Sequence, residues 1–328
     1  MESVQAPISI GDTALKPACG IHTFSHGAMG TGFEVYISGV SDTYAQQSAQ
    51  AGFAELDRLE LELSRFIENS DVSRINNFAG KGPIEIGADT FESLETALRL
   101  FRQTDGAFDI TIGALRDCWQ DKNGTLLNPS REQIELAGRC TGSNLIRLDS
   151  QRHTAQILAE GVNIDLGGIG KGYALDKMAE VFKQWGISSA LINGGCSSVL
   201  ALNPVHKQKG WPLSFSNMSA PKQILRRVYL NNCALGSSSL EYGPHIFDSR
   251  MARPAERTSR AVWVRSADAA SADALSTAFM VMSIDEINEY CKKNTKVSAI
   301  AAIPKGDKCT DVQLLTFGNW NTDTPVDT

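Results

Sequence analysis

Residues 162–198 read VNIDLGGIGKGYALDKMAEVFKQWGISSALINGGCSS, a stretch that predicts a strand, a glycine-rich loop, a helix and a second strand in succession. Apolar residues alternate over 162–166 and predict the first strand. Over 173–182 they recur at helical spacing, which predicts a helix that stops at Gly186. The second strand is expected over 190–192, where apolar residues precede a pair of glycines.

The loop before the helix holds four glycines around one lysine: Gly167, Gly168, Gly170 and Gly172 around Lys171. Glycines let backbone amides approach a ligand closely, and the amides at a helix start attract phosphate. With the positive charge of Lys171, the pattern is typical of a diphosphate-binding loop. It is not a P-loop, because Gly172 stands where Ser or Thr is needed, and G-x-G-x-G fails the dinucleotide spacing. On these residues alone, a glycine-rich turn without a ligand is the alternative.

Length and composition are those of an ordinary globular protein. The 328 residues are 42% hydrophobic and 21% charged, which suits one elaborate domain or two coupled ones. A net charge of −6 without a basic run argues against a nucleic-acid-binding protein. No apolar stretch is long enough for a transmembrane helix, so no membrane span is expected.

The N-terminus and the cysteines bear on location. Residues 1–20 lack the basic and apolar regions of a signal peptide, and no apolar segment precedes Cys19 as a lipoprotein signal would require. Seven cysteines, an odd number without a CxxC pair, suggest neither a disulfide framework nor a zinc site. We therefore expect reduced thiols and a cytoplasmic location.

The rest of the chain predicts helices and strands in alternation. A tight turn is expected at Met29–Thr31, and the glycine- and serine-rich residues 234–244 are expected to form a loop. Helices are expected over 42–66, 90–104 and 267–282, after 128–130, and from a capping box at 283–286. Strands are expected near 146 and over 33–37, 155–158, 211–215, 227–230, 261–265, 297–303 and 312–317. The expected organisation is a flexible arm over 1–24, one domain over 25–318 that could contain two intertwined subdomains, and a polar tail over 319–328.

Three acidic or basic positions are candidates for chemistry. Asp273 and Thr277 lie four residues apart in an expected helix, so their oxygens face the same way and could bind a hard cation such as Mg²⁺. The alternative is that Asp273 caps or solvates a helix while Thr277 bonds back to the preceding turn. Asp109 lies between apolar residues and needs partners, which a ligand could supply. His245 is a candidate base, although a structural histidine is the alternative.

Seven segments occur in a specific order along nearly the whole chain beyond residue 25. They are MGT at 29–31, SRF…SDVSRIN at 64–76, GAFDITIG at 106–113, IDLGGIGKGYALD at 164–176, INGG at 192–195, HIFDSR…RPA at 245–255 and ADALSTA at 272–278. In this order they resemble the ApbE family, the FAD:protein FMN transferases. The resemblance implies an α+β fold related to the T-fold, with mixed and antiparallel sheets flanked by helices around an FAD cleft.

The resemblance also implies an activity and a set of site residues. Members of the family transfer FMN from FAD to a Thr or Ser hydroxyl of a target flavoprotein and release AMP, with Mg²⁺ on the diphosphate. FAD is then the substrate, and the partner is a flavoprotein with an exposed Thr or Ser. The implied FAD contacts are Met29, Phe66, Ala107, Phe108, Asp109, Asp165, Lys171 and Ile246. The implied metal site consists of the Gly168 carbonyl, Asp273, Ser276 and Thr277, and the implied catalytic residues are His245 and Asp273.

The chain departs from the family pattern at three places. Phe66 stands where tyrosine is usual, Cys196 stands where a second glycine is common, and HIFDSRMA at 245–252 replaces HIIDPRTG. These changes leave the metal residues intact but bear on the positioning of the acceptor. Two alternatives to the transferase therefore stay open, an FAD diphosphatase that releases FMN and AMP, and a non-catalytic FAD-binding protein.

Overall fold

The structure is a computed structural model that describes residues 8–10, 20–121, 124–195, 197–205, 208–217, 220–239, 246–255, 259, 261–305 and 311–320. Its α-helices are α1 (Asp42–Leu63), α2 (Asp71–Asn77), α3 (Ala88–Gln103), α4 (Gly113–Trp119), α5 (Arg131–Arg139), α6 (Gly170–Gln184), α7 (Ala269–Val281) and α8 (Ile284–Lys293). A short 3₁₀ helix, Ser143–Leu145, precedes β5.

An eight-stranded sheet forms the centre of the molecule, with the strand order β16-β15-β14-β11-β8-β7-β3-β2. Adjacent strands in this sheet are all antiparallel. The strands are β2 (Ile21–Ala28), β3 (Thr31–Ser38), β7 (Ser189–Gly194), β8 (Ser198–Ala201), β11 (Cys233–Ser239), β14 (Ala261–Ser266), β15 (Ser298–Pro304) and β16 (Val312–Phe317). Smaller sheets contain β1 (Ile8–Ile10), β9 (Trp211–Asn217) and β10 (Ala220–Leu230); β4 (Ile84–Glu85), β5 (Ile146–Asp149) and β6 (Thr154–Ile157); and β12 (Phe247–Asp248) and β13 (Arg253–Pro254).

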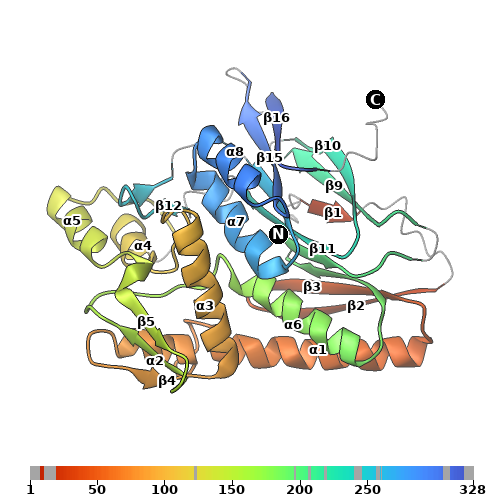
Figure 1. The fold of residues 1–328 in the computed structure, drawn as a ribbon, viewed down its shortest axis with the longest axis horizontal. Coiled ribbons are helices and arrows are strands. Elements are labelled where there is room, and N and C mark those ends of the chain that lie inside the picture. The colour runs from red at the N-terminus through yellow and green to blue at the C-terminus, as the bar shows by residue number, and fades with distance from the viewer. Residues whose placement is uncertain are drawn as a thin grey trace.

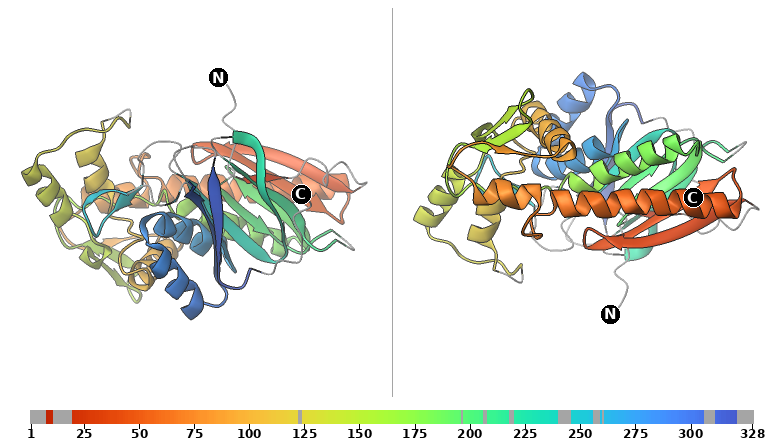
Figure 2. Two further views of the ribbon diagram at one scale, coloured as in Figure 1. Left: turned by 90° about the horizontal axis from the view of Figure 1, so that it is seen from above. Right: turned by 90° about the horizontal axis from the view of Figure 1, so that it is seen from below.

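The central sheet is covered on both faces, because its strands alternate apolar side chains between two cores. In β14, Val262 and Val264 join the core beneath α1, α6 and α7, whereas Trp263 joins the core beneath β9 and β10. Trp263 stacks on Phe215 of β9 at 4.8 Å between ring centroids. Helix α1 lies along α6 and β2 (Figures 1 and 2). The predicted α+β class, with antiparallel sheets flanked by helices, is confirmed.

The hairpin that joins β2 to β3 has the tight turn that the sequence predicts. Met29 and Gly30 form a two-residue connection, and both have positive φ, 50° and 71°. This is the backbone geometry of a type I′ turn, which matches the twist of the paired strands. The predicted helix over 173–182 is also confirmed within α6, and Gly186 with φ 71° follows its end.

Two predicted elements are wrong. The strand expected over 162–166 is reduced to a single bridge between Asn163 and Ile112. The side chain of Asn76 bonds both backbone groups of Ile164, so a neighbouring strand is not needed there. The loop expected over 234–244 begins as the buried strand β11, and residues 240–245 lie outside the described part. Small residues form this strand because α7 packs directly on it: a Cβ at Gly236 would collide with the Ala272 carbonyl.

The two ends of the chain contribute to the fold. Within the segment expected to be a flexible arm, β1 pairs with β9 and β2 starts at Ile21. At the other end, Trp320 is buried against the core beneath β9, while residues 321–328 lie outside the described part. No helix in the described ranges is long and apolar enough to cross a membrane.

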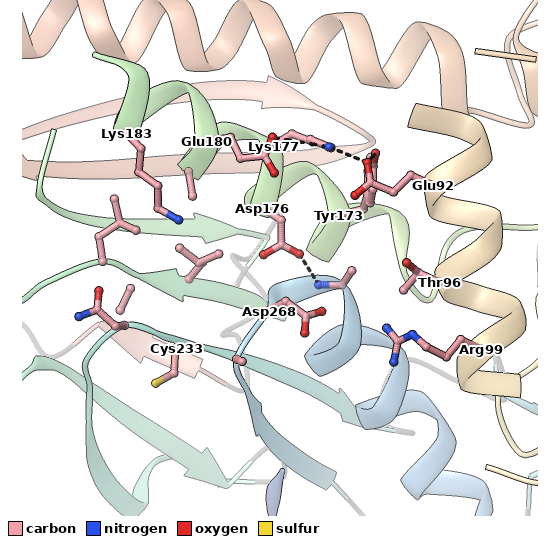
Figure 3. Close-up of a pocket in the computed structure, with 17 residues that line it drawn as sticks. Glu92, Thr96, Arg99, Tyr173, Asp176, Lys177, Glu180, Lys183, Cys233 and Asp268 are labelled. Carbon is pink, nitrogen blue, oxygen red and sulfur yellow. Dashed lines mark hydrogen bonds and ion pairs between the residues drawn. The ribbon is translucent and has the colours of Figure 1, made fainter. Parts of the chain in front are cut away.

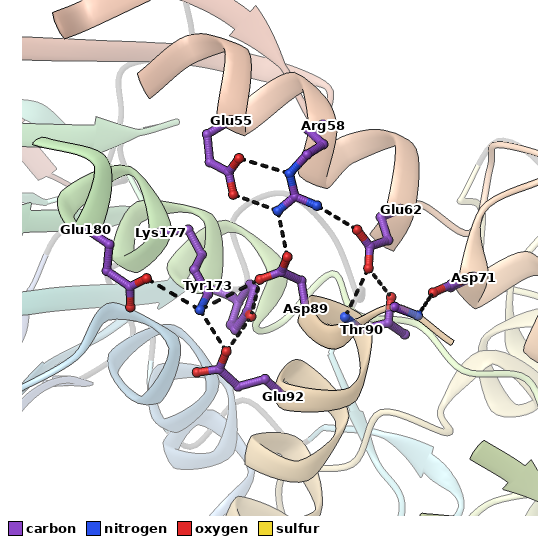
Figure 4. A network of polar contacts seen from close by, with 11 residues as sticks. Glu55, Arg58, Glu62, Asp71, Asp89, Thr90, Glu92, Tyr173, Lys177 and Glu180 are labelled. Carbon is purple, nitrogen blue, oxygen red and sulfur yellow. Dashed lines mark hydrogen bonds and ion pairs between the residues drawn. The ribbon is translucent and has the colours of Figure 1, made fainter. Parts of the chain in front are cut away.

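A polar network holds α6 against α1 and α3 (Figure 4). The hydroxyl of Tyr173 on α6 donates to Asp89 at 2.8 Å and to Glu92 at 2.9 Å, both on α3. Arg58 of α1 pairs with Asp89 at 2.6 Å, and Lys177 of α6 pairs with Glu92 at 2.7 Å. Burial and the two carboxylates raise the pKa of Tyr173, so its hydroxyl remains a donor. The network fixes the helix that starts at the glycine-rich loop.

We predict that Gly236→Ala destabilises the protein, because the new methyl group would force α7 away from β11. The expected loss is about 1–3 kcal/mol in the free energy of unfolding, measured by urea denaturation. Gly27→Ala is the matched control, since nothing lies within 4 Å of a Cβ at that strand position. Equal stability of the two variants would show that the contact is not tight.

Candidate functional site

Two adjoining cavities lie at the start of α6. The first, of about 470 Å³, is lined by Asp273 and Thr277 and is called here the Asp273 cavity. The second, of about 400 Å³, is lined by Phe66 and is called the Phe66 cavity. Both are lined by Asp165, Gly167 and Lys171 of the glycine-rich stretch. The loop and its lysine therefore form the junction between the two cavities.

The structure brings the predicted FAD contacts to these two cavities. Met29 and Phe66 line the Phe66 cavity, Asp165 and Lys171 line both, and the remaining predicted contacts line the Asp273 cavity: Ala107, Phe108, Asp109 and Ile246. Phe66 is 80% exposed, which leaves its ring accessible to a ligand. Whether these residues contact FAD stays a prediction.

Asp273 projects from α7 towards the start of α6. Its carboxylate accepts the Gly172 amide N–H at 3.1 Å and the Ser198 hydroxyl at 3.0 Å, and the Lys171 ammonium lies 4.0 Å away. Asp273 is only 4% exposed. Burial raises its pKa, although Lys171, Gly172 and Ser198 oppose the rise. A cation would compensate the buried negative charge.

The other predicted metal residues lie beside Asp273, but not all face the cavity. A Cβ at Gly168 would lie 3.4 Å from the Thr277 hydroxyl oxygen, so loop and helix meet there. Ser276 is fully buried, and its hydroxyl donates to the Asp273 carbonyl at 2.8 Å. Ser238 of β11 lies within hydrogen-bonding distance of both the Ser276 and Thr277 hydroxyls, at 2.8 and 3.3 Å. Ser276 therefore supports the helix turn rather than lining the cavity.

This donor set fits Mg²⁺, which prefers carboxylate, hydroxyl and carbonyl oxygens. Asp273, Thr277 and Gly168 offer one of each, and all three line the Asp273 cavity. The described residues contain no cluster of three or more His, Cys, Asp or Glu suited to a metal. A cation here would thus depend on substrate oxygens for further ligands, as Mg²⁺ sites with phosphates do.

Asp109 has the buried setting that the sequence predicts and a free oxygen. Its Oδ1 accepts from the Thr111 amide, the Thr111 hydroxyl and the Ser143 hydroxyl at 2.7–2.8 Å. Its Oδ2 is buried without a hydrogen-bond partner among the described residues. Burial raises the pKa of Asp109. An unpartnered buried oxygen in a cavity wall is a position where a ligand donor would be stabilised.

Two arginines that sequence reasoning missed converge on Asp165. The Arg65 guanidinium lies 3.2 Å from Asp165 and 4.1 Å from the centroid of the Phe66 ring, while Arg116 pairs with the same carboxylate oxygen. Arg116 also pairs with Asp117 at 3.5 Å, so the two guanidiniums face two carboxylates beside the junction. Arg65 and Arg116 stand in quoted or neighbouring motifs, but no spacing rule links them to each other.

The remaining candidates are placed as follows. His245 and Cys196 lie outside the described residues. Asp248 pairs with Arg250 at 3.1 Å, and Arg250 bridges to Glu286 of α8 at 2.8 Å. These charges tie the β12–β13 hairpin to α8 rather than facing the cavity.

We predict that Asp273→Asn weakens the pH dependence of stability in metal-free protein. Because burial raises the folded-state pKa above the ordinary value of 3.8, the folded protein holds this proton at pH values where the unfolded chain has lost it. The free energy of unfolding therefore falls as the pH rises above 3.8 through the folded-state pKa. Urea denaturation at pH 5 and pH 8 in EDTA should show a smaller fall in Asp273→Asn than in wild type. Asp285→Asn, at an exposed position, should behave like wild type; parallel behaviour of all three proteins would contradict the prediction.

Comparison with known proteins gives consistent matches along most of the chain. The model of the ApbE family matches residues 29–301. The FAD:protein FMN transferase of Chlamydia muridarum is 30% identical over 73% of this chain and 78% of its own length. The FAD:protein FMN transferase of Escherichia coli K12 is 25% identical over 81% of this chain and 79% of its own.

Solved structures show the same fold. The ApbE protein of Thermotoga maritima is 26% identical, with a TM-score of 0.77 over 86% of this chain and 94% of its own. The flavinyl transferase ApbE of Pseudomonas stutzeri, 23% identical, has a TM-score of 0.80 over 90% of this chain and 94% of its own. As its sequence motifs predict, this chain belongs to the ApbE family of flavin transferases.

Proposed function

We propose that this chain transfers FMN from FAD to a Thr or Ser hydroxyl of an acceptor flavoprotein, in a Mg²⁺-dependent reaction that releases AMP. One observation carries the proposal. Two adjoining cavities share the glycine-rich loop and Lys171, and the wall of one presents Asp273, Thr277 and Gly168 together. The curated relatives named FAD:protein FMN transferase support the same reaction class.

The substrate has a suitable position across the junction. The exposed ring of Phe66 suits stacking against the flavin, and the Arg65 guanidinium lies 4.1 Å from its centroid. The diphosphate would lie at the junction, near Lys171 and the first amides of α6. Lys171 is held there by the Gly167 carbonyl at 3.4 Å and by Asp273 at 4.0 Å.

The reaction needs charge stabilisation and in-line placement more than covalent help. The acceptor oxygen forms a bond to the FMN-side phosphorus, the bond from that phosphorus to the AMP oxygen breaks, and AMP leaves. Lys171 and the helix-start amides would stabilise the negative charge on the diphosphate oxygens. Mg²⁺, held by Asp273, Thr277 and the Gly168 carbonyl, would supply further charge neutralisation there.

The proton of the acceptor hydroxyl also needs a base. We assign metal-coupled activation of this hydroxyl to Asp273, because its carboxylate lines the cavity beside Lys171 and the proposed Mg²⁺. His245, outside the described residues, remains a candidate for orienting the acceptor or relaying the proton. A cytoplasmic location and an acceptor with an exposed Thr or Ser also remain predictions from the sequence.

The test is incubation with FAD, Mg²⁺ and a candidate acceptor flavoprotein, followed by intact mass spectrometry and an AMP assay. The expected result is an acceptor mass gain equal to an FMN phosphoester, matched by AMP and abolished by EDTA. Asp273→Asn should lower the rate about a hundredfold or more, because the buried charge at the diphosphate is lost. Asp285→Asn, with the same chemical change at an exposed position of α8, is the control.

Two other outcomes would contradict the transferase. AMP release by wild type without acceptor labelling, across several acceptor flavoproteins, would indicate an FAD diphosphatase. Tight FAD binding without AMP release or labelling would indicate a non-catalytic FAD-binding protein.

We also predict that Phe66→Ala weakens FAD binding about tenfold without lowering the free energy of unfolding, because the exposed ring packs little in the free protein. Flavin fluorescence titration and urea denaturation measure the two effects. Phe78→Ala is the matched control, since Phe78 is also exposed and near a cation, Lys81 at 6.0 Å, but lines neither cavity. Equal FAD affinity in the two variants would remove Phe66 from the flavin site.

A further inference from the structure

A carboxylate on α6 caps the start of α7. Asp176 accepts the backbone N–H groups of Ala269 at 2.8 Å and Ala270 at 2.9 Å, the first two residues of α7. Figure 3 shows the Asp176 side chain pointing towards the start of α7, beside Asp268. Asp268 accepts the next N–H, that of Ser271, at 2.7 Å. The first N–H groups of a helix have no partner within it, so these carboxylates satisfy donors that would otherwise be lost. One of them comes from a different helix.

The same two helices touch again one turn away, at the candidate site. A Cβ at Gly172 would collide with the Ala269 carbonyl, so the two backbones are in direct contact. The Gly172 N–H donates to Asp273 at 3.1 Å. This N–H lies in the first turn of α6, where the helix offers it no backbone partner. Whether the Gly172 N–H is hydrogen-bonded therefore depends directly on the position of Asp273.

Ionisation of Asp176 lowers the free energy of unfolding. It lines a third cavity, of about 400 Å³, which shares no lining residue with the two cavities at the candidate site. Burial raises the pKa of Asp176 to about 7, and the negative charges of Asp268 and Glu180 add to the rise, while the Ala269 and Ala270 amides oppose it. The other charged or titratable groups of this cavity are Glu92 and Arg99 of α3, Tyr173, Lys177 and Lys183 of α6, and Cys233 of β11.

The direction of this pKa shift distinguishes a positioning role of Asp176 from a stabilising one. A folded-state pKa above the ordinary 3.8 means that Asp176 contributes stability below pH 3.8 and that this contribution is lost as the pH rises through about 7. Near pH 8, its negative charge therefore lowers stability rather than raising it. What the ionised group provides there is two strong acceptors for the start of α7.

We propose that Asp176 is a positioning residue for the candidate metal site: its carboxylate fixes the first turn of α7 against α6 and thereby holds Asp273 in place. The role of Asp273 in this statement rests on the proposed function. The contacts that hold Asp273 in place do not depend on the proposed function. Asp176 lines neither of the two cavities at the candidate site, so we place its influence in the contact between α6 and α7.

The first test needs no metal. Amide hydrogen exchange of Gly172, followed by NMR at pH 8, should be roughly tenfold faster in Asp176→Ala than in wild type, a change expected for loss of a helix cap. Asp176→Asn, which keeps one acceptor oxygen, should lie between them. Glu180→Gln is the control, because Glu180 lines the same cavity but pairs with Lys177 at 3.6 Å. Unchanged Gly172 exchange in both Asp176 variants would overturn the proposal.

The second test measures Mn²⁺ binding in the presence of FAD by electron paramagnetic resonance. The Kd for Mn²⁺ should rise about tenfold in Asp176→Asn at a temperature where thermal denaturation shows both proteins to be folded. A lower thermal midpoint with unchanged Mn²⁺ affinity would mean a structural role and would overturn the proposal. If wild type binds no Mn²⁺, the proposed function loses its metal site, and the Gly172 exchange alone decides whether Asp176 holds Asp273.

Discussion

The backbone of α7 lies in direct contact with two neighbours, and the candidate site depends on both contacts. On one side Gly172 lets α6 approach the Ala269 carbonyl, and on the other Gly236 lets β11 approach the Ala272 carbonyl. Any side chain at either glycine would push α7 away. Between these contacts, Asp273 reaches the Gly172 amide and the Ser198 hydroxyl. The acidic group is thus fixed by backbone packing, at the point where the glycine-rich loop turns into a helix.

This packing is compatible with the proposed function, in which a buried carboxylate would hold a diphosphate through a cation. Asp273 is desolvated, which raises its pKa, and its nearest described cation is Lys171 at 4.0 Å. A buried charge with so distant a partner favours any cation that can enter the cavity. Arg65 and Arg116 also lie at the junction, where both pair with Asp165. In the proposed function, the arrangement would combine a cation site with an anion site, as a metal–diphosphate complex requires.

Features encoded in local residue patterns could be predicted from the sequence. The turn at Met29–Gly30, helix α6 and the capping box at Ser283 all follow from neighbouring residues, and the structure has each of them. Patterns set by distant partners could not be predicted. Strand β11 is rich in small residues and resembles a loop in sequence, because α7 packs on Gly236 and leaves no room there for a side chain.

The same limit applies to the candidate site. Every residue predicted to contact FAD lines one of the two cavities, but Arg65 and Arg116 meet at Asp165 only through the fold. Residues 162–166 read as a strand by their alternation, yet the side chain of Asn76 takes the place of a neighbouring strand. Ser276 lies on the predicted helical face, but its hydroxyl turns back to the Asp273 carbonyl.

The central claim is that the start of α6 and the middle of α7 form one metal–diphosphate site between two cavities. A crystal structure with FAD and Mn²⁺, recorded with anomalous scattering from manganese, tests it most directly. We predict one anomalous peak, from a manganese ion coordinated by Asp273, Thr277, the Gly168 carbonyl and diphosphate oxygens. The flavin should lie against Phe66. Ordered FAD with its diphosphate away from Lys171, or with no manganese at Asp273, would contradict it.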